Sequence, residues 1–257
     1  MIESLKRHWR EYLMEAAGLA GFVGGASLLT VFLEHPELAV MQSVLGGHPL
    51  LRRVPLGIIL GAYIGGVVYL LGKRSGAHIN PAVTWAFYRL GKINFADAVF
   101  YTLAQFAGAI AAAQIMKMAL GDFYRDSPIH YVVTEPAKWD HSGAWAFAAE
   151  FFISFVLMFT CLIAANSSRL EKLVAPLTGV LIALYLIVET PYSGMSLNPA
   201  RSFGSALAAN EWRYLWIYFV APPLAMLTAA EIFRLTKSFF GGLIDKEQPS
   251  YPNYEEN

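Results

Sequence analysis

Charged residues are scarce in this sequence, and cysteine is almost absent. Only 15% of the 257 residues are Asp, Glu, Lys or Arg, whereas soluble domains carry about 25%. The 19 basic residues balance the 19 acidic ones, so no basic stripe indicates a nucleic-acid partner. The single cysteine, Cys161, excludes an internal disulfide, and CxxC and zinc-finger spacings are absent. With 56% hydrophobic residues, the sequence predicts a polytopic membrane protein.

Long apolar runs occupy about half of the chain. A helix needs about 20 apolar residues to cross a hydrocarbon core of ~30 Å. The runs predict six transmembrane helices and leave no room for a sizeable soluble domain. The first run is too long for a signal peptide and lacks a clear cleavage site. The predicted spans are Tyr12–Leu33, Val54–Gly72, Ala98–Met116, Ser142–Asn166, Leu173–Val188 and Tyr214–Phe233.

The distribution of basic residues predicts the orientation. Lysine and arginine are more numerous on the segments that share a side with the N-terminus. The positive-inside rule therefore predicts a multi-pass protein of the cell membrane with both termini in the cytoplasm. The segment Asp245–Asn257 is polar and contains two prolines, so we expect it to be disordered.

Two apolar segments between the spans repeat one another. Residues 75–87 and 193–205 align without a gap, each reading Ser-Gly, three residues, then Asn-Pro-Ala, at an offset of 118. Each follows the second of three spans, and an odd number of spans makes two halves insert with opposite topology. We therefore expect one domain over 1–257, with repeat halves at about 11–118 and 143–240. The boxes are Asn80, Pro81 and Ala82, and Asn198, Pro199 and Ala200.

The residue types in each box predict the start of a short helix. Asn is a favoured N-cap, and Pro is favoured at the first helical position. A helix of about ten residues from Asn80 or Asn198 would be ~15 Å long, half a bilayer. Gly76 and Gly194 permit irregular backbone before each cap. Such backbone is tolerated at membrane depth only where protein buries it or a wet cavity adjoins it. We expect two inverted half-helices that meet at their N-termini.

The chain resembles the major intrinsic protein family, the aquaporins and glycerol facilitators, and is most like a prokaryotic member. The resemblance runs from Glu15 to about Phe233 and implies six transmembrane helices, two re-entrant half-helices and a pore in every protomer of a homotetramer. The residues themselves give no reason to expect a cofactor, a metal site or a nucleic-acid partner. The positions that carry the resemblance are Glu15, Gly18, Ala104, Gln105, Gly108, Ala109, Glu150, 75–84 and 198–202.

The resemblance also assigns roles at the pore. The amides of Asn80 and Asn198 would donate to a passing water, and Arg201 would be the cationic member of an outer selectivity filter. Counting from the two boxes gives Leu60, Leu186 and Met195 as the other filter positions. Backbone carbonyls on the two loops would form a ladder of acceptors. The residues implied for this ladder are Gly76, Ala77, His78, Ile79, Gly194, Met195 and Ser196.

The filter departs from the usual patterns of the family. Water-selective members usually carry an aromatic residue and a histidine where this chain has Leu60 and Leu186, and glycerol facilitators usually carry two aromatics and a glycine. The positions after the second box, Ser202 and Ala206, favour a water channel. We therefore expect a water channel with some leakage of small neutral solutes. The alternative is a facilitator of glycerol or other small neutral solutes.

Two carboxylates, Glu15 and Glu150, lie inside the first helix of each half. An ionisable residue within the membrane indicates function by default, and a proton relay in a coupled transporter is one alternative. Their matched positions favour a structural role instead, in which each holds backbone N–H groups of a re-entrant loop. No nucleophile–base pair, metal constellation or phosphate-binding loop predicts an enzyme or an ATP-driven transporter.

Overall fold

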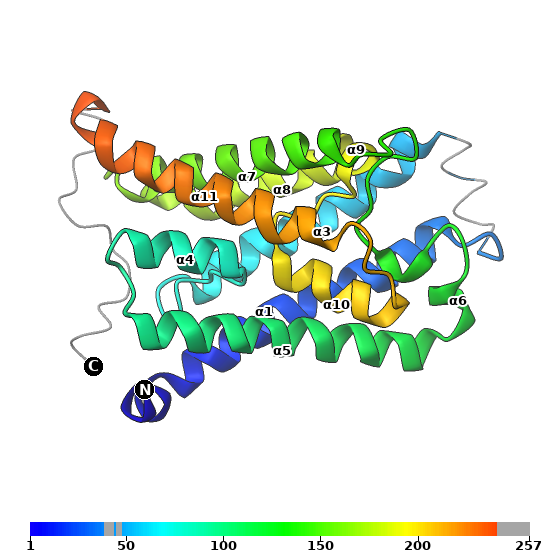
Figure 1. Cartoon of the computed structure of the whole chain (residues 1–257), viewed down its shortest axis with the longest axis horizontal. Helices are drawn as coiled ribbons and strands as arrows, with labels where there is room; N and C mark the ends of the chain where they lie inside the picture. Colours follow the sequence, from blue (N-terminus) through cyan, green and yellow to red (C-terminus); the bar gives the residue numbers. More distant parts are fainter. Residues whose placement is uncertain (39–43, 45–47, 241–257) are drawn as a thin grey trace.

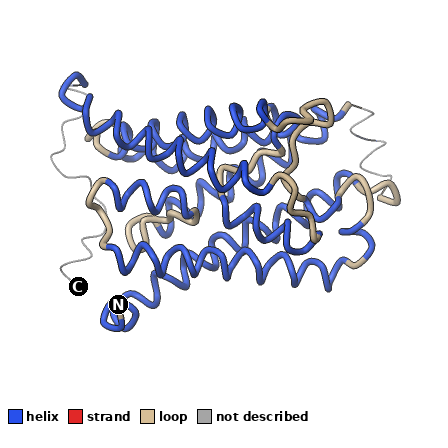
Figure 2. Tube along the Cα trace, in the orientation of Figure 1, coloured by secondary structure: helices blue, strands red, loops and turns tan. Residues whose placement is uncertain are grey.

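The computed structural model describes residues 1–38, 44 and 48–240 as a bundle of long helices (Figure 1). All regular elements in these residues are helices, and strands are absent from this part of the chain (Figure 2). Six helical segments are long and apolar enough to cross a membrane. The long helices are α1 (Ile2–Glu34), α3 (Pro49–Leu71), α5 (Phe95–Leu120), α7 (Ala144–Ala165), α8 (Val174–Val188) and α11 (Leu215–Thr236).

These helices confirm the six predicted spans and a multi-pass membrane protein. The clearest difference is at the N-terminus, where α1 begins at Ile2 instead of Tyr12. The backbone stays helical through the charged residues but bends at His8 (φ −115°, ψ 20°). The predicted disordered tail, Asp245–Asn257, lies outside the described residues. Shorter helices in the described residues include α6 (Asp122–Arg125), η1 (His130–Val132), η2 (Glu171–Leu173), α9 (Thr190–Ser193) and η3 (Lys237–Phe240).

The two repeated boxes begin short helices. These are α4 (Pro81–Arg89), with 9 residues, and α10 (Pro199–Ala209), with 11. At 1.5 Å per residue each is about 15 Å long, half the thickness of a bilayer core. They leave the middle of the bundle in opposite directions, α4 toward the end that carries the N-terminus and α10 away from it (Figure 1). The predicted fold class, six transmembrane helices and two re-entrant half-helices in an inverted 3+3 repeat, is confirmed.

The packing of the helices follows the repeat. In each half the first span packs on the third, α1 on α5 and α7 on α11. The second spans of the two halves, α3 and α8, pack against each other. Each half-helix also contacts the third span of the opposite half, α4 on α11 and α10 on α5. The two halves therefore share one core, with the half-helices at its centre.

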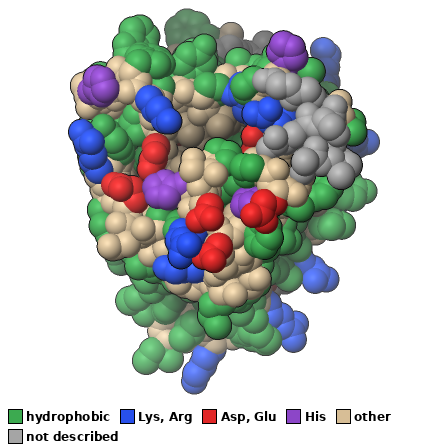
Figure 3. Space-filling view, turned by 90° about the vertical axis from the view of Figure 1, so that its right-hand side faces the viewer, with side chains coloured by type: hydrophobic (Ala, Val, Ile, Leu, Met, Phe, Trp, Pro, Cys, Tyr) green, Lys and Arg blue, Asp and Glu red, His purple; other side chains and the backbone are tan. Residues whose placement is uncertain are grey.

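The end of the bundle opposite the N-terminus has a polar centre. Acidic, basic and histidine side chains gather there, and apolar side chains surround them on the flanks (Figure 3). At this end Nδ1 of His130 lies 3.5 Å from Oε1 of Glu135, and both side chains are exposed. This end of the bundle therefore presents polar and charged groups to its surroundings.

Candidate functional site

Both half-helices begin at a capping asparagine in the buried centre. The Asn80 side-chain oxygen accepts a hydrogen bond from the N–H of Ala82 at 2.8 Å. The Asn198 oxygen accepts from Ala200 at 3.0 Å and from Arg201 at 3.3 Å. In each helix a proline holds the first position, where its missing N–H costs nothing. The predicted N-caps are confirmed, and the positive ends of both helices face the centre of the bundle.

The two asparagines also connect the loops to each other. Asn80 donates from Nδ2 to the carbonyl oxygen of Leu197 at 2.8 Å, and Asn198 donates to that of Ile79, also at 2.8 Å. A side-chain amide has two N–H groups. Each amide therefore keeps one N–H without a hydrogen-bond partner in the described part of the chain.

The loop backbones before the caps are strained. Four non-glycine residues have a left-handed backbone: Ala77 (φ 49°), Ile79 (φ 42°), Met195 (φ 49°) and Leu197 (φ 60°). This conformation costs about 1–3 kcal/mol per residue and persists only where the surroundings impose it. The strained positions match between the two loops, so the same hydrogen-bonding arrangement should stabilise both.

Glu15 supplies that arrangement for the first loop. Its buried carboxylate accepts from the backbone N–H of His78 at 3.1 Å and from that of Ile79. It also accepts from the hydroxyl of Ser75 at 2.8 Å and the amide of Gln105 at 2.9 Å. A carboxylate has only acceptor oxygens, and the two oxygens of Glu15 accept from all four of these donors.

Glu150 occupies the equivalent place in the second half. It accepts from the backbone N–H of Ser196 at 2.6 Å, from that of Leu197 at 2.8 Å, and from the hydroxyl of Ser193 at 2.8 Å. Like Glu15, it is fully buried. The two carboxylates thus make matching contacts: a serine hydroxyl and two successive backbone N–H groups.

The four filter positions are all buried, and they come from four elements or loops. Leu60 is on α3, Leu186 on α8, Met195 in the loop before the second cap, and Arg201 in the first turn of α10. The three apolar residues belong to one continuous core cluster. Arg201 is 7% exposed, so its charge is held within the protein.

The guanidinium of Arg201 keeps a donor unused. Its Nη1 has no hydrogen-bond partner among the described residues. A cavity of about 10 Å³ adjoins the side chain and is also lined by Ser27, Tyr124 and Tyr131. This is room for about one water molecule, and the hydroxyl groups of the lining provide further polar partners. The geometry therefore allows Arg201 to donate to a small polar molecule.

Two tyrosines at the loops were missed by the sequence analysis. Tyr101 on α5 donates from its hydroxyl to the carbonyl oxygen of Ser75 at 2.8 Å, and Tyr218 on α11 donates to that of Ser193 at 2.5 Å. The serine–tyrosine separations are 26 and 25 residues. This near-equal spacing within an internal repeat was the available signal. Each tyrosine fixes the residue that precedes the glycine of its loop.

His78 is a packed side chain. Its ring stacks on Phe87 with centroids 4.7 Å apart, and its Nδ1 lies 3.1 Å from the hydroxyl of Thr84. It is 5% exposed. In the described residues no group of three or more His, Cys, Asp or Glu side chains is arranged to hold a metal ion.

Comparisons with known proteins agree with this geometry. The sequence profile of the major intrinsic protein family matches residues 8–233. The chain is 33% identical over 172 residues to a putative aquaporin, NIP4-1, of Arabidopsis thaliana, which covers 66% of this chain and 58% of that protein. It is 35% identical over 175 residues to aquaporin NIP2-3 of Zea mays, which covers 67% of this chain and 55% of that protein. The match thus spans less than two thirds of these relatives.

A solved structure has the same fold. The aquaglyceroporin from Plasmodium falciparum superposes with a TM-score of 0.73 at 20% identity, covering 88% of this chain and 95% of that one. At this identity the likeness concerns the fold alone. The resemblance to prokaryotic members in particular stays a prediction, since the relatives named above are plant proteins.

Proposed function

Because the chain belongs to the major intrinsic protein family, we propose that it is a passive channel that conducts water and excludes protons and ions, with some leakage of small neutral solutes. The observation that carries this proposal is the pair of asparagines at the facing half-helix N-termini. Each amide donates one N–H to a carbonyl oxygen of the opposite loop, and its other N–H can donate to a passing molecule. A water that accepts from both amides turns its hydrogens away from the centre.

Ion exclusion follows from the charges at this point. The N-terminus of a helix carries about half a positive elementary charge, and two such ends converge beside Asn80 and Asn198. A cation or proton at the centre is repelled, whereas a neutral molecule is not. Pore width, lining hydrogen-bond groups and half-helix dipoles are the general basis of selectivity in aquaporins, and we assign the same basis to this chain.

We assign the remaining pore roles to the loops and the filter. The ladder of acceptor carbonyls belongs to Gly76, Ala77, His78, Ile79, Gly194, Met195 and Ser196. Leu60, Leu186, Met195 and Arg201 form the outer filter, in which only the guanidinium and backbone groups bind water. Glu15 and Glu150 hold the loops through the hydrogen bonds described above, which supports a structural role instead of a proton relay.

The assembly and placement in the cell are part of the same proposal. We propose a homotetramer in the cell membrane, with a pore in every protomer and both termini in the cytoplasm. Each protomer is a single channel domain with repeat halves at about 11–118 and 143–240. The excess of basic residues on the side of the N-terminus supports this orientation.

The second candidate function is a facilitator of glycerol or other small neutral solutes. The observation in its favour is the aliphatic filter: Leu60 and Leu186 are both buried and neither offers a hydrogen-bond donor. Apart from the hydrogen bonds that Arg201 can donate, such a filter selects among solutes only by their width. The main proposal differs from this one only in which permeant is fastest.

Stopped-flow light scattering on proteoliposomes tests both candidates. Vesicles are shocked once with an impermeant osmolyte and once with glycerol. Fast shrinkage in the first, without rapid re-swelling in the second, is the expected result for a water channel. Rapid re-swelling in glycerol favours the facilitator. Shrinkage no faster than in empty liposomes contradicts an open channel of either kind.

A further inference from the structure

The first turns of α1 form a separate segment before the membrane span. They begin ten residues ahead of the apolar run and depart from the direction of the helix at the bend at His8. Figure 1 shows these turns, in dark blue, directed away from the line that the rest of α1 follows. A helix that turns at the end of the bundle can lie along the membrane surface instead of across it.

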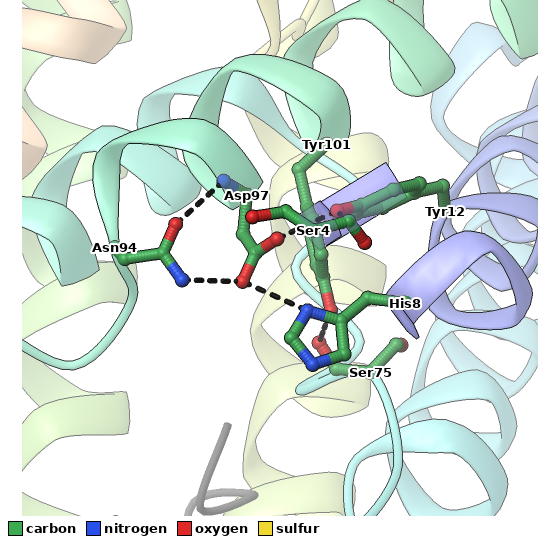
Figure 4. A network of polar contacts seen from close by, with 7 residues as sticks. All are labelled: Ser4, His8, Tyr12, Ser75, Asn94, Asp97 and Tyr101. Atoms are coloured by element: carbon green, nitrogen blue, oxygen red, sulfur yellow. Dashed lines mark hydrogen bonds and ion pairs between the residues drawn. The ribbon is translucent and has the colours of Figure 1, made fainter. Parts of the chain in front are cut away.

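A buried group of side chains fixes this bend. His8 Nδ1 lies 3.0 Å from Oδ2 of Asp97, and the two residues are 7% and 0% exposed. Tyr12 donates to Asp97 Oδ1 at 2.6 Å, and Asn94 donates to its Oδ2 at 2.7 Å. Figure 4 shows these side chains converging on the carboxylate of Asp97 from α1 and from the start of α5. The direction of residues 2–7 is therefore set by the core.

The segment has an exposed apolar stripe. Ile2, Leu5 and Trp9 recur at intervals of three and four residues, which brings them to one face of a helix. They are 75%, 44% and 49% exposed. Because all three side chains are exposed, the apolar stripe faces away from the core of the protein. A stripe of this kind with basic residues beside it is typical of helices that lie in the interface of a bilayer.

The basic residues at this end are available for anions. Lys6, Lys73 and Arg74 make no side-chain hydrogen bond or ion pair with the described residues. Arg10 lies over the ring of Trp9, 5.5 Å from its centroid, and Arg7 pairs with Glu3 at 3.3 Å, where both side chains are exposed. Lys73 and Arg74 follow α3 at the same end of the bundle. Clusters of lysine and arginine directly beside a transmembrane helix attract anionic lipids.

We propose that the first turns of α1, together with Lys73 and Arg74, bind the headgroups of anionic phospholipids in the leaflet on the N-terminal side. Ile2, Leu5 and Trp9 enter the boundary with the acyl chains. The ammonium and guanidinium groups of Lys6 and Arg10 then lie at the depth of the phosphates. His8 and Asp97 are positioning residues, because they hold the segment parallel to the membrane surface. The proposal is independent of whether the pore conducts.

Co-purification of lipid tests the proposal. The full-length protein in detergent is mixed with equal amounts of phosphatidylglycerol and phosphatidylcholine, and the ratio of the two lipids that elute with it on gel filtration is measured. We expect the wild type to retain phosphatidylglycerol severalfold over phosphatidylcholine. Lys6→Gln/Arg10→Gln should bring the ratio close to one. The matched control, Lys138→Gln/Arg213→Gln, removes the same charge at the opposite end and should leave the ratio unchanged.

Three further measurements test the role of His8, the role of charge and the occupancy of the surface by lipid. His8→Gln leaves the basic residues in place but loses the anchor, and it should lower the ratio without changing the elution volume of the protein. High salt should reduce the preference of the wild type, because it screens exposed charges. A ratio near one in the wild type, or an equal loss in the control, overturns the proposal. Another outcome is that the full-length protein shows no preference while a chain that lacks residues 241–257 prefers phosphatidylglycerol. That result would mean that the acidic tail occupies the surface in the full-length protein, and the proposal would be wrong.

Discussion

Lys117 donates a hydrogen bond from Nζ to the carbonyl oxygen of Ala208 over 2.7 Å, in the last turn of half-helix α10. The C-terminal end of a helix carries a partial negative charge and carbonyl groups without an intrahelical partner. A lysine there offsets the charge and donates a hydrogen bond to one of the carbonyl oxygens. Lys117 belongs to α5, in the first half of the chain, whereas α10 belongs to the second. The contact therefore fixes one half-helix against the opposite half of the repeat.

Removal of this lysine should destabilise the protein. Lys117→Met leaves the carbonyl of Ala208 without its charged donor, and hydrogen bonds to charged groups contribute about 1.5–3 kcal/mol. We expect a lower midpoint of thermal unfolding in detergent, followed by intrinsic fluorescence. Lys138→Met, at an exposed loop position, is the matched control and should unfold like the wild type. Equal midpoints for the two variants would show that the contact does not stabilise α10.

Close packing of α3 on α8 predicts a second difference in stability. A Cβ at Gly61 would lie 2.5 Å from the carbonyl oxygen of Gly179 and 2.7 Å from the Cβ of Ala183. Both distances are too short, so Gly61→Ala must push the helices apart, and overpacking costs about 1–3 kcal/mol. A Cβ at Gly66 meets nothing within 4 Å. Gly66→Ala should keep or raise the unfolding midpoint, since Ala favours helix.

A comparison of the two alanine variants tests this contact directly. Both change glycine to alanine within the same helix, so the difference in helix propensity cancels. Gly61→Ala should lower the midpoint of thermal unfolding relative to Gly66→Ala. If the two midpoints agree, the distance between α3 and α8 is not set by these glycines.

The long spans and the half-helices could be predicted from the sequence because their signals are local. Twenty apolar residues predict a span wherever they occur, and Asn80 and Asn198 before proline predict a helix start from adjacent residues alone. The contacts of Glu15 and Glu150 could be anticipated because the repeat gives each residue a counterpart. Most of the fold could therefore be predicted from local signals and from the internal repeat.

The contacts missed by the sequence analysis join residues that are far apart in the chain. His8 and Asp97 are separated by 89 positions, and Asn80 and Leu197 by 117. Nothing in the neighbourhood of Asp97 indicates that a histidine near the N-terminus will be buried against it. The helical start at Ile2 was missed for the same reason. The residues before Tyr12 are too charged to predict a transmembrane span, and the bend at His8 depends on its contact with the distant Asp97.

Glu150 should be required for an ordered second loop. In Glu150→Gln an amide N–H₂ replaces one of two acceptor oxygens, so the N–H of either Ser196 or Leu197 loses its partner. An unsatisfied buried donor costs about 1–3 kcal/mol, and the strained backbone at Met195 and Leu197 loses its support. We expect the water permeability per inserted protein to fall by about tenfold, equivalent to ~1.4 kcal/mol of barrier.

The matched control for this variant is Glu135→Gln, which changes an exposed glutamate outside the loop hydrogen bonds. It should conduct water like the wild type in stopped-flow light scattering, with the amount of inserted protein measured by immunoblot. If Glu150→Gln also conducts normally, the carboxylate does not hold the loop in its conducting shape. Flux that then depends on a pH gradient would favour a proton relay instead.

The width of the filter can be tested at Leu60. This side chain is 2% exposed, and its Cδ2 lies 3.5 Å from the position of a Cβ on Gly25, so it faces the interior of the bundle. Phenylalanine is larger and rigid, and Leu60→Phe should narrow the passage beside Arg201. A glycerol molecule is wider than water and must pass the same constriction. We expect the ratio of glycerol to water permeability to fall by about tenfold, equivalent to ~1.4 kcal/mol of barrier.

The ratio is the useful quantity, because it does not depend on how much protein inserts or folds. Ile59→Phe makes the same kind of change at the neighbouring residue, whose side chain is 48% exposed on the outside of the bundle, and it should leave the ratio unchanged. If Leu60→Phe lowers both permeabilities equally, the residue does not discriminate between solutes by size. The filter would then have to be sought nearer to the asparagines, where the opposing amides of Asn80 and Asn198 lie.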